Sequence, residues 1–223
     1  MLEVIATTLD DAINIEHSGA NRIELVSALT EGGLTPSYAL IKQVVKSVSI
    51  PVNIMIRPHS KSFIYTENDV KTMKEDIEIA RSLKANGVVF GALTKDMEID
   101  EEVLDKLLAS VGDLEVTFHR AIDASADPVK ATKVLKNYTK ITRILTSGGQ
   151  GKIDNNFKTI NEMIKTAGPI ILLGGGITLH NIPHLRENTG AKEFHVGTAV
   201  RKNHLCLSEI DEASIKKILA KIC

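Results

Sequence analysis

LEVIA at residues 2–6, NRIELV at 21–26 and PVNIMI at 51–56 are three short apolar segments bounded by turn-forming residues. Each is rich in valine, isoleucine or leucine, and each is followed by a polar turn and then by a segment with the spacing of an amphipathic helix. Short apolar runs of this kind predict strands that are buried on both faces. The first part of the chain therefore predicts consecutive strand–helix units.

The same unit continues to the end of the chain, recurring roughly every 28 residues, which is 223 divided by eight. Five further strands are predicted, at 86–90 (NGVVF), 114–118 (LEVTF), 141–146 (ITRILT), 169–173 (PIILL) and 192–196 (KEFHV). Eight units without a linker or a break in composition predict one α/β domain over 1–223, a (β/α)8 TIM barrel with parallel strands. The competing architecture is an open doubly wound sheet. It is less favoured because the G-x-G-x-x-G nucleotide fingerprint is missing.

Helix starts are marked by capping residues. Thr66-x-x-Asp69 predicts the start of a long helix that runs to about Lys84, with its apolar residues on one face. Thr35-Pro36 predicts another start, with threonine as the cap and proline at the first helical position. Helices with one apolar face are what the outer layer of a barrel requires.

Composition and charge exclude several classes of protein. Apolar residues make up 43% of the 223 residues, charged residues 25%, and the net charge is −1, whereas a nucleic-acid-binding domain normally has a basic face. No apolar run approaches the ~18 residues of a membrane helix. The first residues lack the basic region of a signal peptide, so we expect a cytoplasmic protein without nucleic-acid or membrane partners. Reduced thiols are expected at Cys206 and Cys223, although the sequence leaves a disulfide between them open.

In a barrel of this kind, residues at the carboxyl ends of the strands carry function. Reading each strand at its exit, with side chains alternating inward and outward, gives five candidates for catalytic residues: Glu24, Arg57, His119, Arg120 and His195. Arginine binds carboxylates and phosphates in bidentate fashion, and histidine exchanges a proton near neutral pH. The sequence therefore predicts a barrel mouth that binds an anion and moves protons.

The alternative is a purely structural role for these charges. A buried ion pair, for example of Glu24 with Arg57 or Arg120, would fill the barrel without any chemistry. Glu3 and Glu115 lie earlier in their strands, nearer the bottom of the barrel or its wall, and are interpreted as structural.

Glycine-rich segments follow the later strands. Ser147, Gly148 and Gly149 come after the sixth predicted strand, and Gly175 and Gly176 after the seventh. Glycines let backbone N–H groups approach a phosphate closely, and barrels often build a phosphate site from their last strand exits. These five residues are the candidate anion site. The alternative is that the glycines serve only tight turns.

Several long runs resemble the CutC copper-homeostasis family. They are Arg22-Ile23-Glu24-Leu25-Val26-Ser27-Ala28-Leu29, Gly32-Gly33-Leu34-Thr35-Pro36-Ser37, Pro51-Val52-Asn53-Ile54-Met55-Ile56-Arg57-Pro58, Val89-Phe90-Gly91, Glu115-Val116-Thr117-Phe118-His119-Arg120-Ala121, Arg143-Ile144-Leu145-Thr146-Ser147-Gly148-Gly149 and Glu193-Phe194-His195. The resemblance spans about residues 2 to 199 in order. It implies a cytosolic (β/α)8 barrel, a homo-oligomer and a role in copper handling.

The chain departs from that family at two positions. Members for which Cu(I) binding is proposed carry cysteines where Ile5 and Val26 stand here, and neither side chain can coordinate a metal. The remaining soft groups are Met55, expected in the core, and Cys206 and Cys223, expected away from the strand exits. We therefore predict no metal ligands, and copper is implied only by the resemblance.

Three hypotheses follow. The first is a copper-homeostasis protein that binds or moves Cu(I). The second is an enzyme that acts on a small anionic metabolite, a class that includes phosphorylated metabolites, at the barrel mouth. In that case Arg57 and the glycine-rich exits hold the anion, His119 is the general acid or base, and Glu24 is its partner or a second base. The third is a barrel whose surface is an interaction platform.

Overall fold

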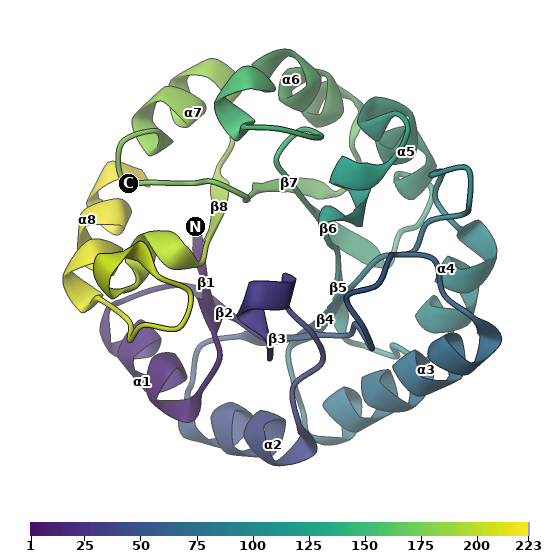
Figure 1. Cartoon of the computed structure of the whole chain (residues 1–223), viewed down its shortest axis with the longest axis horizontal. Coiled ribbons are helices and arrows are strands. Elements are labelled where there is room, and N and C mark those ends of the chain that lie inside the picture. Colours follow the sequence, from purple (N-terminus) through teal and green to yellow (C-terminus); the bar gives the residue numbers. More distant parts are fainter. Residues whose placement is uncertain (223) are drawn as a thin grey trace.

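The eight predicted strands form a closed parallel barrel in the computed structural model of the chain, which describes residues 1–222 (Figure 1). Each strand pairs with the next, and the last pairs with the first. This confirms the predicted TIM barrel. The strands are β1 (Leu2–Ala6), β2 (Arg22–Leu25), β3 (Val52–Met55), β4 (Gly87–Phe90), β5 (Glu115–Phe118), β6 (Ile141–Thr146), β7 (Ile170–Leu173) and β8 (Glu193–Val196).

Helices surround the barrel as an outer ring, and α8 closes that ring beside α1 (Figure 1). Their apolar faces pack on the strands in one continuous core. The helices are α1 (Leu9–His17), α2 (Tyr38–Ser47), α3 (Glu67–Ser82), α4 (Glu101–Leu108), α5 (Pro128–Leu135), α6 (Phe157–Thr166), α7 (Ile182–Thr189) and α8 (Glu212–Ile222). Short 3-10 turns lie in the strand exits: η1 (Leu29–Glu31), η2 (Arg120–Ala124), η3 (Ile153–Asn155), η4 (Thr198–Val200) and η5 (Lys202–His204).

One of the two predicted helix starts is confirmed and the other is wrong. Thr66 caps α3 in a capping box with Asp69, as its spacing predicted. The cap of α2, however, is Ser37 and not Thr35. The Thr35 hydroxyl instead accepts the Arg57 backbone N–H at 2.9 Å, which ties the exit of β2 to the exit of β3. A tertiary contact thus takes the residue that local sequence would use as a cap.

Five charged residues fill the amino-terminal half of the barrel, and we call them the barrel network: Glu3, Arg22, Glu115, Arg143 and Glu193. Arg22 contacts Glu3 and, at 3.0 Å, Glu193. Arg143 contacts Glu193 at 2.9 Å and also Glu115. Five strands are therefore joined by side-chain ion pairs inside the barrel.

Among residues 1–222, no helix combines the length and the apolar character that a membrane crossing requires.

Candidate functional site

A cavity of about 670 Å³ lies among the carboxyl-terminal exits of the strands. All five candidate catalytic residues line it: Glu24, Arg57, His119, Arg120 and His195. They come from β2, β8 and the segments that follow β3 and β5. The structure therefore brings together all five side chains that were predicted from the strand ends. Their catalytic role stays a prediction.

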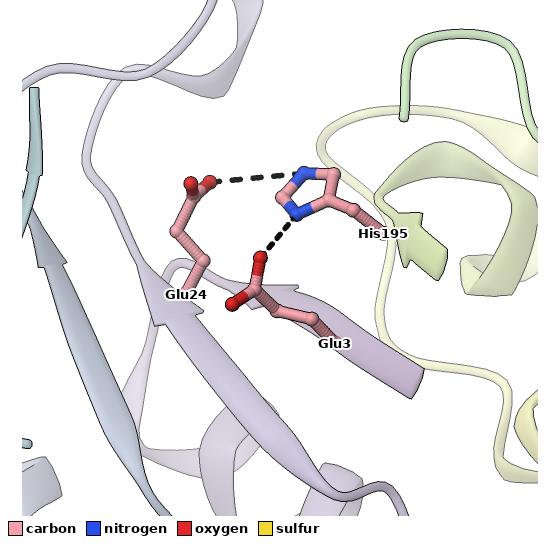
Figure 2. Close-up of side chains that lie close together, drawn as sticks. All are labelled: Glu3, Glu24 and His195. Atoms are coloured by element: carbon pink, nitrogen blue, oxygen red, sulfur yellow. Dashed lines mark hydrogen bonds and ion pairs between the residues drawn. The ribbon is translucent and has the colours of Figure 1, made fainter. Parts of the chain in front are cut away.

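His195 lies between two carboxylates on the floor of this cavity. Its Nδ1 is 2.7 Å from a Glu3 carboxylate oxygen, and its Nε2 is 3.8 Å from a Glu24 oxygen (Figure 2). Burial raises the pKa of Glu3, but the hydrogen bond of His195 and the charge of Arg22 outweigh it and lower that pKa to about 2. Glu3 is therefore ionised at neutral pH, and Nδ1 of His195 carries a hydrogen that it donates to Glu3.

Glu24 forms fewer hydrogen bonds and ion contacts than Glu3. Burial raises its pKa to about 7, although the charge of His195 acts in the opposite direction. Within residues 1–222 its ion contact is with His195, and it forms none with Arg57 or Arg120. The alternative of a space-filling pair between Glu24 and either arginine does not describe this structure. A carboxyl group with this pKa can give or take a proton near neutral pH.

His119 is a neutral hydrogen-bond donor at the cavity wall. Burial and then the nearby Arg57 lower its pKa to about 3, so the ring stays uncharged. Its Nδ1 accepts the Ala121 backbone N–H at 3.3 Å, which places the hydrogen on Nε2. The side chain caps η2 and packs edge-on against Phe63, with ring centroids 5.0 Å apart.

Arg57 is held in place by the segment after β2. Its Nη1 donates to the Glu31 and Gly33 carbonyls at 3.1 and 3.3 Å, and its guanidinium lies 4.8 Å from the Phe63 ring centroid. These contacts use some of the guanidinium N–H donors of Arg57 and hold its side chain in the wall of the cavity.

Three buried polar atoms of the cavity residues find no hydrogen-bond partner among residues 1–222: Glu24 Oε1, Arg57 Nε and His119 Nε2. We call them the open polar atoms. Buried polar groups are nearly always hydrogen-bonded in folded proteins. Three such atoms in residues that share one cavity are hydrogen-bonding capacity that residues 1–222 leave unused.

The glycine-rich exit of β6 is occupied by a carboxylate of the protein itself. Asp123 accepts the backbone N–H groups of Ser147 and Gly149 at 3.0 and 3.1 Å, and the N–H of Gly148 donates to the Thr146 hydroxyl. Asp123 also accepts from Arg120 Nε at 2.8 Å. Three of the five predicted anion-site residues thus have their backbone donors engaged within the chain.

The exit of β7 is different. The backbone N–H groups of Gly175 and Gly176 have no acceptor among residues 1–222, and both residues line the cavity with φ of +85° and +91°. The Arg120 guanidinium lies against this backbone, because a Cβ added to Gly175 would be 2.5 Å from its Cζ. The Arg120 side chain is 46% exposed. A guanidinium beside two free N–H groups is a suitable place for an anion.

Comparison with known proteins places the chain in a family. The model of the CutC family matches residues 1–200. The chain belongs to the CutC family. Human and mouse proteins named copper homeostasis protein cutC homolog are each 43% identical over 197 residues, which cover 87% of this chain and 72% of theirs. CutC from Parabacteroides distasonis is 41% identical over 198 residues, 87% of this chain and 81% of its own.

Solved structures agree on the fold. CutC from Streptococcus agalactiae has a TM-score of 0.82 at 33% identity, covering 87% of this chain and 97% of its own. Phosphoribosyl anthranilate isomerase from Thermotoga maritima has a TM-score of 0.68 at 17% identity, covering 99% and 97%, which shows a shared fold alone.

The CutC resemblance implies copper thiolates at positions 5 and 26, and the residues present do not fit them. Ile5 and Val26 pack with Met55 and Val89 in one small apolar cluster, and Ile5 lines the cavity. The two positions are therefore neighbours in space, but hydrocarbon side chains cannot coordinate Cu(I).

Cys206 was expected away from the strand exits, and that placement is wrong. It lies in the segment after β8, half-buried, and lines the same cavity. The loop after η5 folds back over the barrel mouth, which the spacing of strands along the chain does not reveal. Cys206 forms no disulfide within residues 1–222, and Cys223 lies outside the described residues.

Sequence reasoning missed three residues of this site. Glu3 was interpreted as structural only, yet it contacts His195 as well as Arg22. Phe63 and Asp123 hold the wall and the β6 exit. Glu3 could have been found, because parallel pairing of β8 with β1 sets it beside His195. Phe63 lies in an irregular segment and has no such signal.

Proposed function

We propose that this CutC-family chain is an enzyme that binds a small anionic molecule in the cavity and moves a proton on it. The observation that carries the proposal is the set of open polar atoms of Glu24, Arg57 and His119. The three residues line one cavity together with the exposed guanidinium of Arg120. A pocket with a few convergent polar groups and a perturbed carboxyl pKa is the usual form of an active site.

The anionic group is assigned to the exit of β7. Gly175 and Gly176 supply backbone N–H donors there, and Arg120 supplies the positive charge. Arg120 donates to Asp123 through Nε and to the Ser147 hydroxyl through Nη2, which leaves Nη1 of the guanidinium for the ligand. A phosphate or a carboxylate meets both kinds of donor.

The proton is assigned to Glu24. With its pKa raised to about 7, this carboxyl group exists in both forms at neutral pH. Neutral His119 donates from Nε2 to an oxygen of the ligand, as an uncharged imidazole can when negative charge develops there. Glu24 then takes or gives the proton at a neighbouring carbon or oxygen.

Phosphate binding tests the anion site. We expect inorganic phosphate to shift backbone amide resonances around Gly175, and the Gly175→Ala variant to bind it at least tenfold more weakly, because the new Cβ displaces Arg120. Gly151→Ala is the matched control. Gly151 has nearly the same φ, +87°, but nothing lies within 4 Å of an added Cβ. Equal phosphate affinity in the two variants would contradict the assignment.

Hydrogen exchange tests the proton step. The protein is incubated in D2O with a mixture of small phosphorylated and carboxylated metabolites, and mass spectrometry detects deuterium at carbon. Native protein should label at least one compound, and Glu24→Gln should label none. If Glu24→Gln labels the same compound at the native rate, Glu24 is not the proton-transferring group.

A role in copper homeostasis is the second candidate, because that is what the human and mouse relatives are named for. Met55 lies in the apolar cluster, and Cys206 is the thiol that lines the cavity. Anaerobic titration with Cu(I) against a competing chelator tests direct binding. If a Cys206→Ser variant binds Cu(I) as tightly as the native chain, the thiol in the cavity does not bind Cu(I). A cytoplasmic, homo-oligomeric protein remains part of this proposal.

A further inference from the structure

Three ligand atoms meet at the floor of the cavity. One nitrogen of His195 and one carboxylate oxygen each from Glu3 and Glu24 all lie within 4.8 Å of one another, and all three side chains are buried (Figure 2). We propose that Glu24 and His195 bind a borderline divalent cation such as Zn²⁺, and that Glu3 orients the His195 ring for it. The residues of this site suit that ion for three reasons.

The first reason is the direction of the ring. The Glu3 carboxylate accepts the hydrogen of His195 Nδ1 at 2.7 Å, so a neutral ring presents the lone pair of Nε2 to Glu24. A carboxylate behind the histidine is the usual support of a histidine that binds a metal, because it fixes the tautomer and makes the far nitrogen more basic. Glu3 is itself fixed by Arg22.

The second reason is the spacing of the donors. Bonds of ~2.0–2.1 Å in tetrahedral geometry place two ligand atoms about 3.3 Å apart. The separation of His195 Nε2 from Glu24 Oε2 is 3.8 Å. A shift of about half an ångström in either side chain closes the difference, which is within the freedom of a glutamate carboxylate.

The third reason is the open lone pairs of Glu24. Its Oε1 has no hydrogen-bond partner among residues 1–222, although the residue is only 2% exposed. The two arginines of the cavity do not compensate it, because Arg57 is bound to the η1 segment and Arg120 to Asp123. A cation in the gap between Glu24 and His195 would bind lone pairs of Glu24 that no donor of the described chain takes.

The donor set also selects the kind of ion. Imidazole and carboxylate suit Zn²⁺ and its neighbours, whereas Cu(I) prefers thiolate and thioether sulfur. The ion would share the cavity with the proposed anion, and water or that anion would complete its coordination. The inference goes beyond the proposed function, in which the metal-free Glu24 carboxyl group carries the proton. A bound cation would keep Glu24 ionised, so the two proposals describe alternative states of this side chain.

Competition with a chromogenic chelator measures the site, using Zn²⁺ alone and metal-free protein. We expect one Zn²⁺ per chain, bound at least 100-fold more weakly by Glu24→Gln and by His195→Gln. Glu31→Gln is the matched carboxylate control, because Glu31 lines the same cavity but is exposed. His184→Gln controls for surface binding by His180 and His184, which are exposed and four residues apart. Both controls should bind within twofold of the native chain.

X-ray absorption of the Zn²⁺-loaded native chain gives a readout that does not depend on variants. The expected shell holds nitrogen and oxygen at ~2.0–2.1 Å and no sulfur at ~2.3 Å. Sulfur in the shell would assign the ion to a cysteine thiolate and overturn the proposal, as would Zn²⁺ binding that Glu24→Gln leaves unchanged. Phosphate binding to metal-free protein is measured in parallel, so loss of the cation site and loss of the anion site are told apart.

Discussion

Two groups of charged side chains lie inside one barrel, and they are completed in opposite ways. The barrel network at the amino-terminal ends of the strands joins two arginines with three glutamates. No buried polar side-chain atom of these five residues lacks a partner within residues 1–222. The residues that carry the three open polar atoms line the cavity at the carboxyl-terminal ends. The described chain supplies a partner for each buried polar side-chain atom of the network, but not for those of the cavity residues.

Glu3 belongs to both groups and shows where one ends. One of its oxygens contacts Arg22 in the network, and the other contacts His195 in the cavity. Its neighbour Glu24 lies nearer the strand exits, because in the register of β1 with β2 it pairs with Ile5, two residues after Glu3. Glu24 forms no ion pair with an arginine within residues 1–222. The comparison teaches that burial and charge alone do not mark a functional site. The number of contacts left open does.

Breaking the network should have the largest effect. Arg22→Met leaves the Glu3 and Glu193 carboxylates buried without their shared partner, so we expect a loss of about 3–5 kcal/mol in the free energy of unfolding, measured by urea denaturation. Lys130→Met is the control, because it removes a pair with Glu98 that lies in solvent. It should leave the urea midpoint unchanged. A loss under about 1 kcal/mol for Arg22→Met would mean that the network does not stabilise the barrel.

The sequence predicted this barrel well because strands and helices report local physics. Short apolar runs mark strands buried on both faces, and each predicted strand lies within one residue of the observed bounds, as for β2 and β3. The cap of α2 was wrong because Thr35 bonds to the backbone of Arg57, a contact between distant segments. Local patterns carry no information about such contacts.

The sequence predicted which residues belong to the candidate site, but not which contacts they form. Alternation along the strands placed Glu24, His119 and His195 on the inner face. Which glycines keep free N–H groups depends on where the Asp123 carboxylate lies, and that is decided by the fold of η2. The loop that brings Cys206 to the cavity is likewise a tertiary feature.

The second prediction sharpens the contrast between Glu24 and Glu3 through pH. Burial holds the pKa of Glu24 at about 7 in the folded chain, above its ordinary 4.5, so the folded state binds a proton that the unfolded state has lost. The free energy of unfolding should therefore fall as pH rises from about 4.5 to 7. In metal-free buffer at pH 8, Glu24→Gln should be more stable than the native chain by roughly 1–3 kcal/mol.

Glu3 has the opposite sign. Its pKa of about 2 lies below 4.5, so its contribution is present above pH 4.5 and is lost as pH falls toward 2. Urea midpoints taken from pH 3 to pH 8 should show both slopes in the native chain. In Glu24→Gln the fall between about pH 4.5 and pH 6.5 should disappear, whereas any fall at higher pH comes from the raised pKa of His195. If the stability of the native chain does not change between pH 5 and pH 8, the pKa of Glu24 is not raised in the folded chain.

The smallest effect concerns His119 and His195, two buried histidines of the same cavity. Burial lowers the pKa of each, but the carboxylates of Glu24 and Glu3 reverse that effect for His195 and raise its pKa, whereas Arg57 reinforces it for His119. Nitrogen NMR of labelled imidazoles should show His119 neutral from pH 5 to 8 with its hydrogen on Nε2, and His195 charged at the acid end. His119→Asn identifies the first signal. If His119 titrates in this range, its Nε2 is not a fixed neutral donor.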